Sequence, residues 1–404
     1  MKVDEITLDN QAATDLLAAI HSREPVSGLT HNFYRYPARF SPVFARAVIK
    51  AFTMPGDMVL DPFMGGGTTL VEARTLGRMA VGVDLSSLAA FITQVKTTPL
   101  SEADLADIDK WVADIDGHLN IRNSPARAQE WIKEGYQRNI SDKKTWRIRK
   151  ILELALASVN DLNTDEQQRF VRCALLKTGQ WALDCRRVIP SVAEFRCKFR
   201  KFLKEMSEGA REFTSLVQDT DSHWMPQGLR RTICLNRSAI GLNTDPMLTE
   251  YPRPRLILTS PPYPGVHAVY HRWQVQGRKE TPAPFWITST LDSKGASFYT
   301  LGDRRRAGLV SYFRQAQEAF SSIACLADHN TIVVQLVAFS DPSWQLSEYL
   351  GMMQEAGFVE VKASAIANSD DGRVWRCVPN RKWYANQRGA ITASKEVVLF
   401  HRTA

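Results

Sequence analysis

The stretch Met58–Asp84, MVLDPFMGGGTTLVEARTLGRMAVGVD, decides the fold. It opens with a short apolar run of strand length, which leads directly into the glycines of Gly65–Gly67. A segment of helical character follows and stops at Gly77, and Ala80–Val83 is a second short apolar strand that ends on Asp84. This order of strand, glycine turn, helix, strand and acid predicts the first half of a nucleotide-binding βαβ unit.

The glycine turn and the acid suit a nucleotide-like cofactor. Glycines reach positive φ without strain and let a ligand approach the backbone, and the following helix start offers N–H groups and a positive dipole end. Asp84 follows Asp61 by 23 residues (84 − 61), the position from which a carboxylate accepts hydrogen bonds from both ribose hydroxyls of an adenosine cofactor. A glycine turn that only closes a strand–helix unit is the alternative, and the flanking Asp-Pro-Phe and paired threonines argue against it.

The rest of the chain predicts an α/β domain interrupted by helices. Residues 101–228 carry apolar residues at helical spacing, and we interpret them as a mostly helical insertion. Strands and helices alternate again afterwards, with strands expected at 232–235, 256–259, 331–337, about 359–365 and 395–401, and helices at about 308–327 and 343–356. We therefore predict a Rossmann-like sheet with helices on both faces, divided into 1–100, the insertion 101–228 as a possible target-recognition part, and 229–404.

Composition limits the class of protein. The 404 residues are 44% hydrophobic and 23% charged, which is ordinary for a globular protein, and the net charge of +8 suits a polyanionic partner. No stretch approaches the length of apolar residues needed to cross a bilayer, and the acidic start lacks an apolar signal core. The six cysteines form no CxxC pair. We expect no membrane span and no metal site, and a reduced cytoplasmic location.

The glycine turn and the segment before it resemble motifs of a known family. The motif DPFMGGGTT with Asp84 closely resembles the cofactor-binding motif D-P-F-x-G-x-G-T-T of amino-group DNA methyltransferases. The segment Tyr36–Pro42, YPARFSP, resembles the additional motif of the same family, which packs around the methionine end of the cofactor. The resemblance implies the fold of S-adenosylmethionine-dependent methyltransferases and S-adenosylmethionine as the cofactor. It assigns to the cofactor Tyr36, Pro37, Ala38, Phe40, Asp61, Phe63, Gly65, Gly67, Thr68, Thr69, Asp84 and Asn236.

Asn236 departs from the family pattern. It stands where the family often has an acidic residue near the cofactor adenine, so simple capping of a loop explains it equally well.

A second motif, Thr259–Tyr263 (TSPPY), has the elements needed to methylate a base amine. Such an amine is a poor nucleophile because its lone pair is delocalised into the ring, so the protein must hold the amine and aim it at the methyl group. Consecutive prolines fix φ and suit a rigidly placed carbonyl, and a neighbouring aromatic ring can stack on a base flipped out of the helix. The motif resembles the family's [DNS]-P-P-[YFW], which assigns catalysis to Ser260, Pro261, Pro262 and Tyr263. The carried-over roles put Ser260 and the Pro261 carbonyl on the amine, and Tyr263 on the base.

Two later segments, 264–306 and 366–394, combine arginine with aromatic residues. This mixture suits gripping phosphates and stacking on bases. A solvated rim over a packed core is the other interpretation. The helical insertion has two basic clusters of its own, at 143–150 and 186–204, and is the first candidate for reading DNA. The two later segments are the second. The residues expected to contact DNA in them are Arg272, Trp273, Arg304, Arg305, Arg373, Arg376, Arg381 and Lys382.

The sequence thus predicts a methyltransferase acting on duplex DNA by base flipping. In this family SPPY usually accompanies cytosine-N4 methylation, and DPPY or NPPY accompanies adenine-N6, so Ser260 favours cytosine. The alternatives left open are an adenine-N6 enzyme, an RNA base methyltransferase, and a DNA-binding module without turnover. A restriction nuclease or other defence-system partner is possible in each DNA-directed case.

Overall fold

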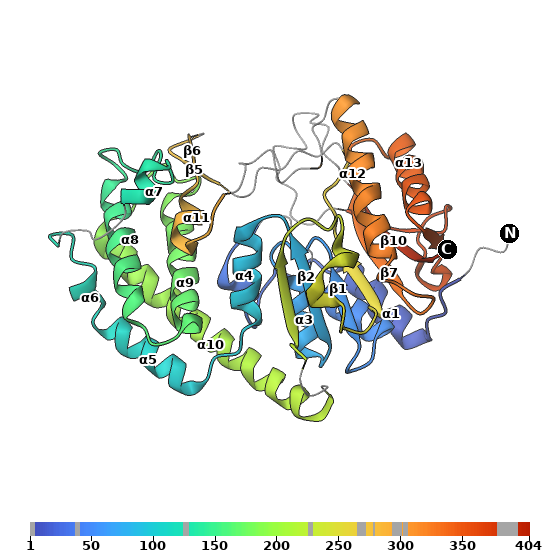
Figure 1. Ribbon diagram of the computed structural model, residues 1–404, viewed down its shortest axis with the longest axis horizontal. Helices are drawn as coiled ribbons and strands as arrows, with labels where there is room; N and C mark the ends of the chain where they lie inside the picture. Colours follow the sequence, from blue (N-terminus) through green and yellow to red (C-terminus); the bar gives the residue numbers. More distant parts are fainter. Residues whose placement is uncertain are drawn as a thin grey trace.

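The computed structural model describes residues 5–36, 41–123, 129–224, 229–264, 272–277, 279–292, 301, 306–377 and 395–404. A central sheet lies beside a separate cluster of helices, seen to its left in Figure 1. The sheet has the strand order β3-β2-β1-β4-β7-β10-β8, and β9 pairs with β10. Its members are β1 (Met58–Asp61), β2 (Met79–Asp84), β3 (Thr232–Asn236), β4 (Leu256–Thr259), β7 (Ile332–Ala338), β8 (Phe358–Val361), β9 (Val374–Cys377) and β10 (Lys395–Thr403).

The first five strands in the sheet order run parallel, and β10 is antiparallel to its neighbours. Helices cover both faces because alternate side chains of a strand point to opposite sides. In β1, Val59 packs with α1 (Asn10–His21), α2 (Pro42–Phe52) and α3 (Thr68–Thr75), whereas Leu60 packs with α12 (Arg306–Ala324) and α13 (Pro342–Glu355). This arrangement confirms the predicted Rossmann-like α/β fold.

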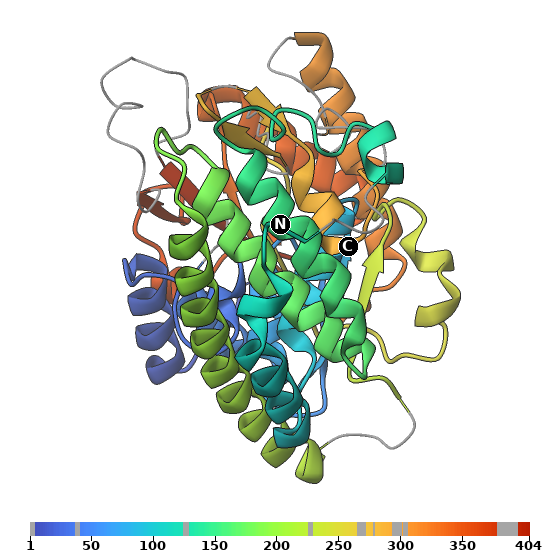
Figure 2. The same cartoon turned by 90° about the vertical axis from the view of Figure 1, so that its left-hand side faces the viewer.

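The helical cluster, which we call the helical lobe, lies between the second and third strands of the chain. It contains α5 (Glu102–Ala113), α6 (Ile115–His118), α7 (Gln129–Lys133), α8 (Trp146–Ser158), α9 (Asp165–Leu183) and α10 (Val192–Trp224). Figure 2, which views the protein from the side of the lobe, shows α10 running along the length of the lobe. Phe213 and Val217 near its end pack against Val71 of α3, so one long helix links the lobe to the α/β core. The helix α4 (Ser87–Thr97) contacts both the sheet and the lobe.

A later part of the chain also joins the lobe, which the sequence did not predict. The hairpin of β5 (Trp273–Val275) and β6 (Lys279–Thr281), with α11 (Ala283–Thr288), packs into the same apolar cluster as α8 and α9. Trp273 is only 1% exposed, and a Cβ on Gly179 of α9 would lie 2.7 Å from its ring. The helical insertion between the strands is as predicted, and the division at residues 100 and 228 as domain boundaries stays a prediction.

Candidate active site

The site begins with the glycine loop between β1 and α3. Gly65 and Gly67 both have positive φ, 47° and 75°, a conformation that favours glycine. The loop is held from behind by α4, where Lys96 Nζ donates to the Gly66 carbonyl at 2.7 Å and Thr93 Oγ1 to the Gly65 carbonyl at 3.2 Å. Two of its carbonyls therefore face the protein, which shapes the loop as a cradle.

The two glycines also leave room for neighbouring side chains. A Cβ on Gly67 would lie 2.6 Å from Thr93 Oγ1, and one on Gly65 would lie 3.3 Å from the ring of Tyr36. The structure therefore brings Tyr36, predicted from the upstream motif, beside the glycine loop. Pro37, Ala38 and Phe40 lie outside the described residues.

Asp84 ends β2 and faces the glycine loop. Its carboxylate accepts hydrogen bonds from the Gly65 and Ser86 N–H groups at 2.9 and 2.8 Å. Burial raises the pKa of Asp84 to about 6. Asn236 pairs with Asp84 across the strands, and its Nδ2 donates to the Asp84 and Leu85 carbonyls, each at 3.0 Å. Asn236 therefore caps the turn that carries the acid.

Asp61 joins the glycine loop to the second motif. Its carboxylate accepts hydrogen bonds from Thr69 Oγ1 of α3 and Thr259 Oγ1 of β4, both at 2.7 Å, and from the Phe63 N–H at 3.1 Å. Asp61 is 2% exposed, and burial raises its pKa to about 6 against the lowering effect of these hydrogen bonds. Asp61 and Thr69 are almost inaccessible, and in this structure they connect the two motifs. Their contact with a cofactor stays a prediction.

Of the other predicted cofactor residues, Thr68 begins α3 and is buried, and Phe63 is half-buried against Phe320 of α12, with ring centroids 6.0 Å apart. Both belong to the loop or to the helix that it starts. Their contact with a cofactor stays a prediction.

The Ser260–Tyr263 motif follows β4, which lies next to β1 in the sheet. The carboxyl ends of adjacent parallel strands meet at one edge, so the motif shares that edge with the glycine loop. Ser260 Oγ donates to the Leu336 carbonyl at 3.0 Å and lies 3.1 Å from the hydroxyl of Tyr263. The Tyr263 hydroxyl donates to Glu396 of β10 at 3.2 Å, and burial raises the pKa of Tyr263 well above its ordinary value.

Tyr312 of α12 fixes the end of the proline pair. Its hydroxyl donates to the Pro262 carbonyl at 2.7 Å. The Pro262 carbonyl therefore has a partner within the protein, which fits the assignment of the amine to the carbonyl before it, on Pro261. Tyr312 could not be predicted from the sequence, because a tyrosine in an amphipathic helix gives no sign of its distant partner.

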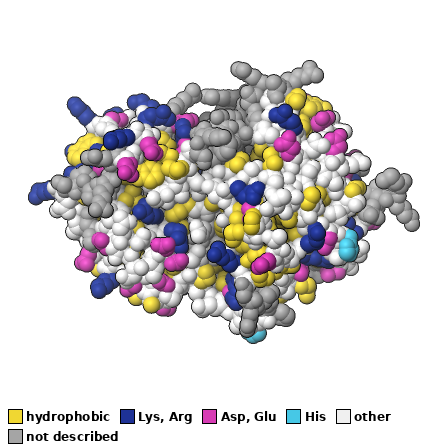
Figure 3. All heavy atoms as spheres, viewed as in Figure 1, with side chains coloured by type: hydrophobic (Ala, Val, Ile, Leu, Met, Phe, Trp, Pro, Cys, Tyr) yellow, Lys and Arg dark blue, Asp and Glu magenta, His cyan; other side chains and the backbone are white. Residues whose placement is uncertain are grey.

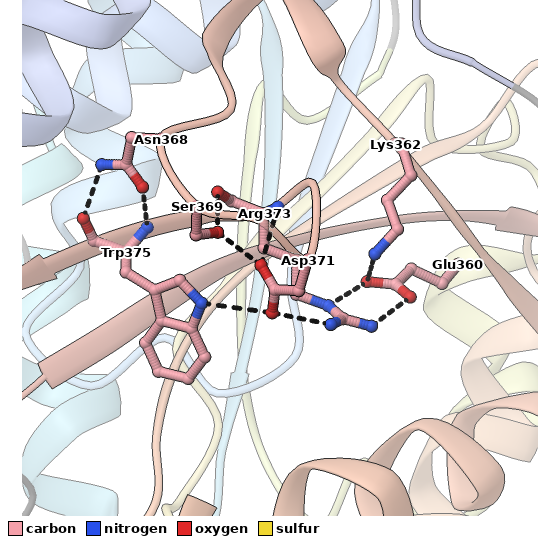
Figure 4. A network of polar contacts seen from close by, with 7 residues as sticks. All are labelled: Glu360, Lys362, Asn368, Ser369, Asp371, Arg373 and Trp375. Atoms are coloured by element: carbon pink, nitrogen blue, oxygen red, sulfur yellow. Dashed lines mark hydrogen bonds and ion pairs between the residues drawn. The ribbon is translucent and has the colours of Figure 1, made fainter.

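A second polar network connects β8 with the segment that leads into β9 (Figure 4). Arg373 donates two hydrogen bonds to Glu360, at 2.7 and 2.8 Å, and one to Asp371 at 2.8 Å. Asn368 accepts from the N–H of Trp375 and donates to its carbonyl, both at 2.8 Å, and the indole N–H of Trp375 points to Asp371 at 3.4 Å. The backbone and the ring edge of Trp375 are therefore both held in place.

The ring of Trp375 lines a pocket of about 910 Å³. Arg23, Pro342 and Lys395 also line it, as does Arg376, which donates to Glu396 at 2.8 Å. Since Glu396 also contacts Tyr263, Arg376 connects the wall of the pocket to the Ser260–Tyr263 motif through Glu396.

The residues expected to contact DNA receive different partners. Trp273 is buried, and its indole N–H donates to the Tyr34 hydroxyl at 3.0 Å, so the structure corrects its expected role as an exposed base-stacking ring. Arg272 donates twice to Asp292, at 3.0 and 2.7 Å. Arg373 and Arg376 are held by the carboxylates named above. Arg304, Arg305, Arg381 and Lys382 lie outside the described residues.

The basic clusters of the helical lobe are partly paired as well. Arg200 contacts Asp116 at 2.7 Å, and Arg196 contacts the same carboxylate at 3.7 Å. On the face seen in Figure 3, positive and negative side chains of the described residues are interspersed. Lys143 and Lys144 are exposed just before α8, and Arg147 is exposed in its first turn.

The cradle fits an adenosine cofactor. Gly65 and Gly67 form a positive-φ turn before the start of α3, and residue Asp84 at the neighbouring strand end is partly exposed, as recognition of a ribose diol requires. Gly65, Gly67 and Asp84 would hold such a group, with Tyr36 against the loop.

Comparison with known proteins finds one family model and several similar proteins. Residues 11–94 match the family model described as DNA methylase. The type II methyltransferase M.MjaII of Methanocaldococcus jannaschii is 30% identical over 127 residues, which cover 31% of this chain and 23% of that protein. M.MvaI of Kocuria varians, also a type II methyltransferase, is 31% identical over 120 residues, 26% of each chain. The type II methyltransferase M.ScaI of Streptomyces caespitosus is 42% identical over 50 residues, 12% of this chain and 16% of its own.

The matched region spans about a quarter or less of the length of each of these relatives. Within the described part of the chain, no helix combines the length and apolarity needed to cross a membrane.

Proposed function

Because the chain belongs to the amino-group DNA methyltransferase family, we propose that it transfers a methyl group from S-adenosylmethionine to the N4 amine of cytosine in DNA. One observation carries the proposal. Ser260–Tyr263 lies at the end of β4 and is connected through Thr259 and Asp61 to the glycine loop of the adjacent β1. A cofactor in the loop and a base at Ser260 would therefore meet at one edge of the sheet.

Asp84 would accept the ribose hydroxyls of the cofactor, and the glycine loop would receive its adenosine part. Bound there, S-adenosylmethionine supplies an electrophilic methyl group. The work of the chain is to keep that group and the target amine in line and to exclude water.

Ser260 and the Pro261 carbonyl would accept the two N–H bonds of the amine. Holding both bonds in one orientation turns the nitrogen lone pair toward the cofactor and away from conjugation with the ring. Tyr263 would stack on the base, which requires the base to leave the duplex.

The pocket at Trp375 is a suitable place for DNA next to the flipped base. Its aromatic ring is fixed in position, and Arg23 and Lys395 are exposed cations at its wall, a combination that grips extended nucleic acid. Arg272, Arg373 and Arg376 instead hold the protein together through their carboxylate partners.

Cytosine is favoured over adenine by Ser260, because the family usually has an acid or an amide there in adenine-N6 enzymes. Such an enzyme would act in the cytoplasm, and a restriction nuclease of the same sequence specificity is the natural partner.

The test is methyl transfer by the whole chain. Labelled S-adenosylmethionine is incubated with unmethylated duplex DNA or with tRNA, using the wild type and Ser260→Ala. We expect label in DNA only, with Ser260→Ala lowering kcat by about 100-fold while cofactor binding, measured by calorimetry, is retained. Label in tRNA alone would support the RNA alternative. Cofactor and DNA binding without transfer would support a module that has lost turnover.

A further inference from the structure

Four groups form a continuous hydrogen-bonded chain from the catalytic motif into the sheet. Ser260 Oγ lies 3.1 Å from the Tyr263 hydroxyl, which lies 3.2 Å from Glu396 Oε1. The other oxygen of Glu396 accepts from Arg376 Nε at 2.8 Å. Glu396 is 6% exposed and Arg376 is 5% exposed, so water does not compete freely for these contacts.

The protons of this chain can be counted. A carboxylate paired with a guanidinium only accepts hydrogen bonds, whereas each hydroxyl has a single proton to donate. Tyr263 keeps its proton because burial raises its pKa well above the ordinary value. The Tyr263 proton must therefore point to Glu396, and it cannot also point to Ser260.

The direction of these hydrogen bonds determines whether Ser260 Oγ can accept one from the substrate. Its own proton goes to the Leu336 carbonyl at 3.0 Å, or to the oxygen of Tyr263. In both cases no side-chain donor of the described residues points at Ser260 Oγ, and its lone pairs are left for an incoming N–H bond. Only in this arrangement can an amine donate to Ser260 Oγ without competing with the Tyr263 proton.

We propose that Glu396, held by Arg376, is a positioning residue that sets the direction of this chain and so keeps Ser260 an acceptor for the target amine. The inference rests on the proposed function, since it concerns how that site receives its substrate. Glu396 lies in β10, 133 residues beyond Tyr263, and is the one acidic residue of that strand.

Glu396→Gln tests the direction. The amide of glutamine can donate to the Tyr263 oxygen, which would turn the tyrosine proton toward Ser260 and occupy the position that the amine needs. We expect kcat for DNA methylation to fall about 10-fold, with the KM for DNA and the affinity for S-adenosylmethionine changed less than about 2-fold.

The control is the same change in a Tyr263→Phe background, where no hydroxyl relays the reversal. We expect Glu396→Gln to lower kcat further by less than about 2-fold there, whatever the baseline of the background. Glu396→Asp keeps a group that only accepts and should recover most of the activity. If Glu396→Gln fails to fold, Arg376→Met makes the same comparison from the other end of the pair, because an unpaired buried carboxyl takes up a proton and becomes a donor.

An equal loss of kcat in both backgrounds would overturn the proposal, because a merely structural role for Glu396 is independent of the tyrosine hydroxyl. A folded Glu396→Gln enzyme with wild-type kcat would overturn it as well. A wild-type protein that methylates no DNA refutes the proposed function itself, which separates the two failures.

Discussion

Thr259→Val removes the hydroxyl that connects the catalytic motif to the glycine loop. Thr259 is fully buried, and its Oγ1 donates to Asp61 Oδ1 at 2.7 Å. Valine has nearly the same shape but cannot donate, so a buried carboxylate loses one of its hydrogen bonds. A hydrogen bond to a charged group contributes about 1.5–3 kcal/mol, and we expect a loss of unfolding free energy of about 2 kcal/mol near neutral pH.

This loss should depend on pH. Burial raises the pKa of folded Asp61 from 3.8 to about 6, a difference of 2.2, which corresponds to about 3 kcal/mol. Since the folded pKa is the higher one, the contribution of Asp61 to stability is fully present below pH 3.8 and is lost as pH rises through about 6. The hydrogen bond from Thr259 lowers this pKa, so Thr259→Val should raise it further. Its destabilising effect should be larger at pH 8 than at pH 5, by about 1 kcal/mol.

The assay is equilibrium unfolding in urea at pH 5 and pH 8, followed by circular dichroism. Thr259→Ser is the matched control, because it keeps the donor and removes only a methyl group. Equal unfolding of Thr259→Val and the wild type, or a Thr259→Ser variant as unstable as Thr259→Val at both pH values, would refute the reasoning about Asp61.

Three further predictions concern the cofactor and DNA surfaces. Since burial raises the pKa of Asp84 to about 6, cofactor affinity should fall about 10-fold between pH 7 and pH 5 as the carboxylate is protonated. Calorimetry on Asp84→Asn should give weak binding that does not depend on pH. If the affinity of this variant still changed with pH, another group would be responsible. Gly67→Ala should destabilise the fold by about 1–3 kcal/mol in urea unfolding, because its Cβ would lie 2.6 Å from Thr93 Oγ1; a wild-type midpoint would contradict the tight packing of the loop. Replacing Lys143 and Lys144 by alanine should reduce the slope of log K against log salt for DNA binding by about 2, whereas an unchanged slope would make this cluster an ordinary solvated surface.

The sequence predicted the α/β fold because its signals are local. The glycine loop needs positive φ, the apolar runs have strand length, and the acid follows at a fixed distance, so β1, α3 and β2 could be placed closely. The hairpin at β5 was missed because its two strands are only three residues long and their burial depends on helices far away in the chain.

For the site, the sequence identified the two motifs but not the contacts between them. Asp61 was expected at the cofactor, yet its partners Thr69 and Thr259 hold it inside, a role that only the adjacency of β1 and β4 creates. Arg373 and Arg376 were expected at DNA because arginines interleaved with aromatic residues suit gripping phosphates. Glu396 lies opposite Arg376 in the pairing of β9 with β10, and Glu360 lies on β8, which pairs with the other end of β10. Such pairing cannot be read from residue type alone.

The central claim is transfer of a methyl group to cytosine N4. The most direct measurement is nucleoside analysis by mass spectrometry of DNA from cells that express this chain in an unmethylated background, with the Ser260→Ala variant alongside. We predict N4-methylcytosine with the wild type and none with the variant. N6-methyladenine in its place, or unmodified DNA from cells that contain the folded protein, would contradict the claim.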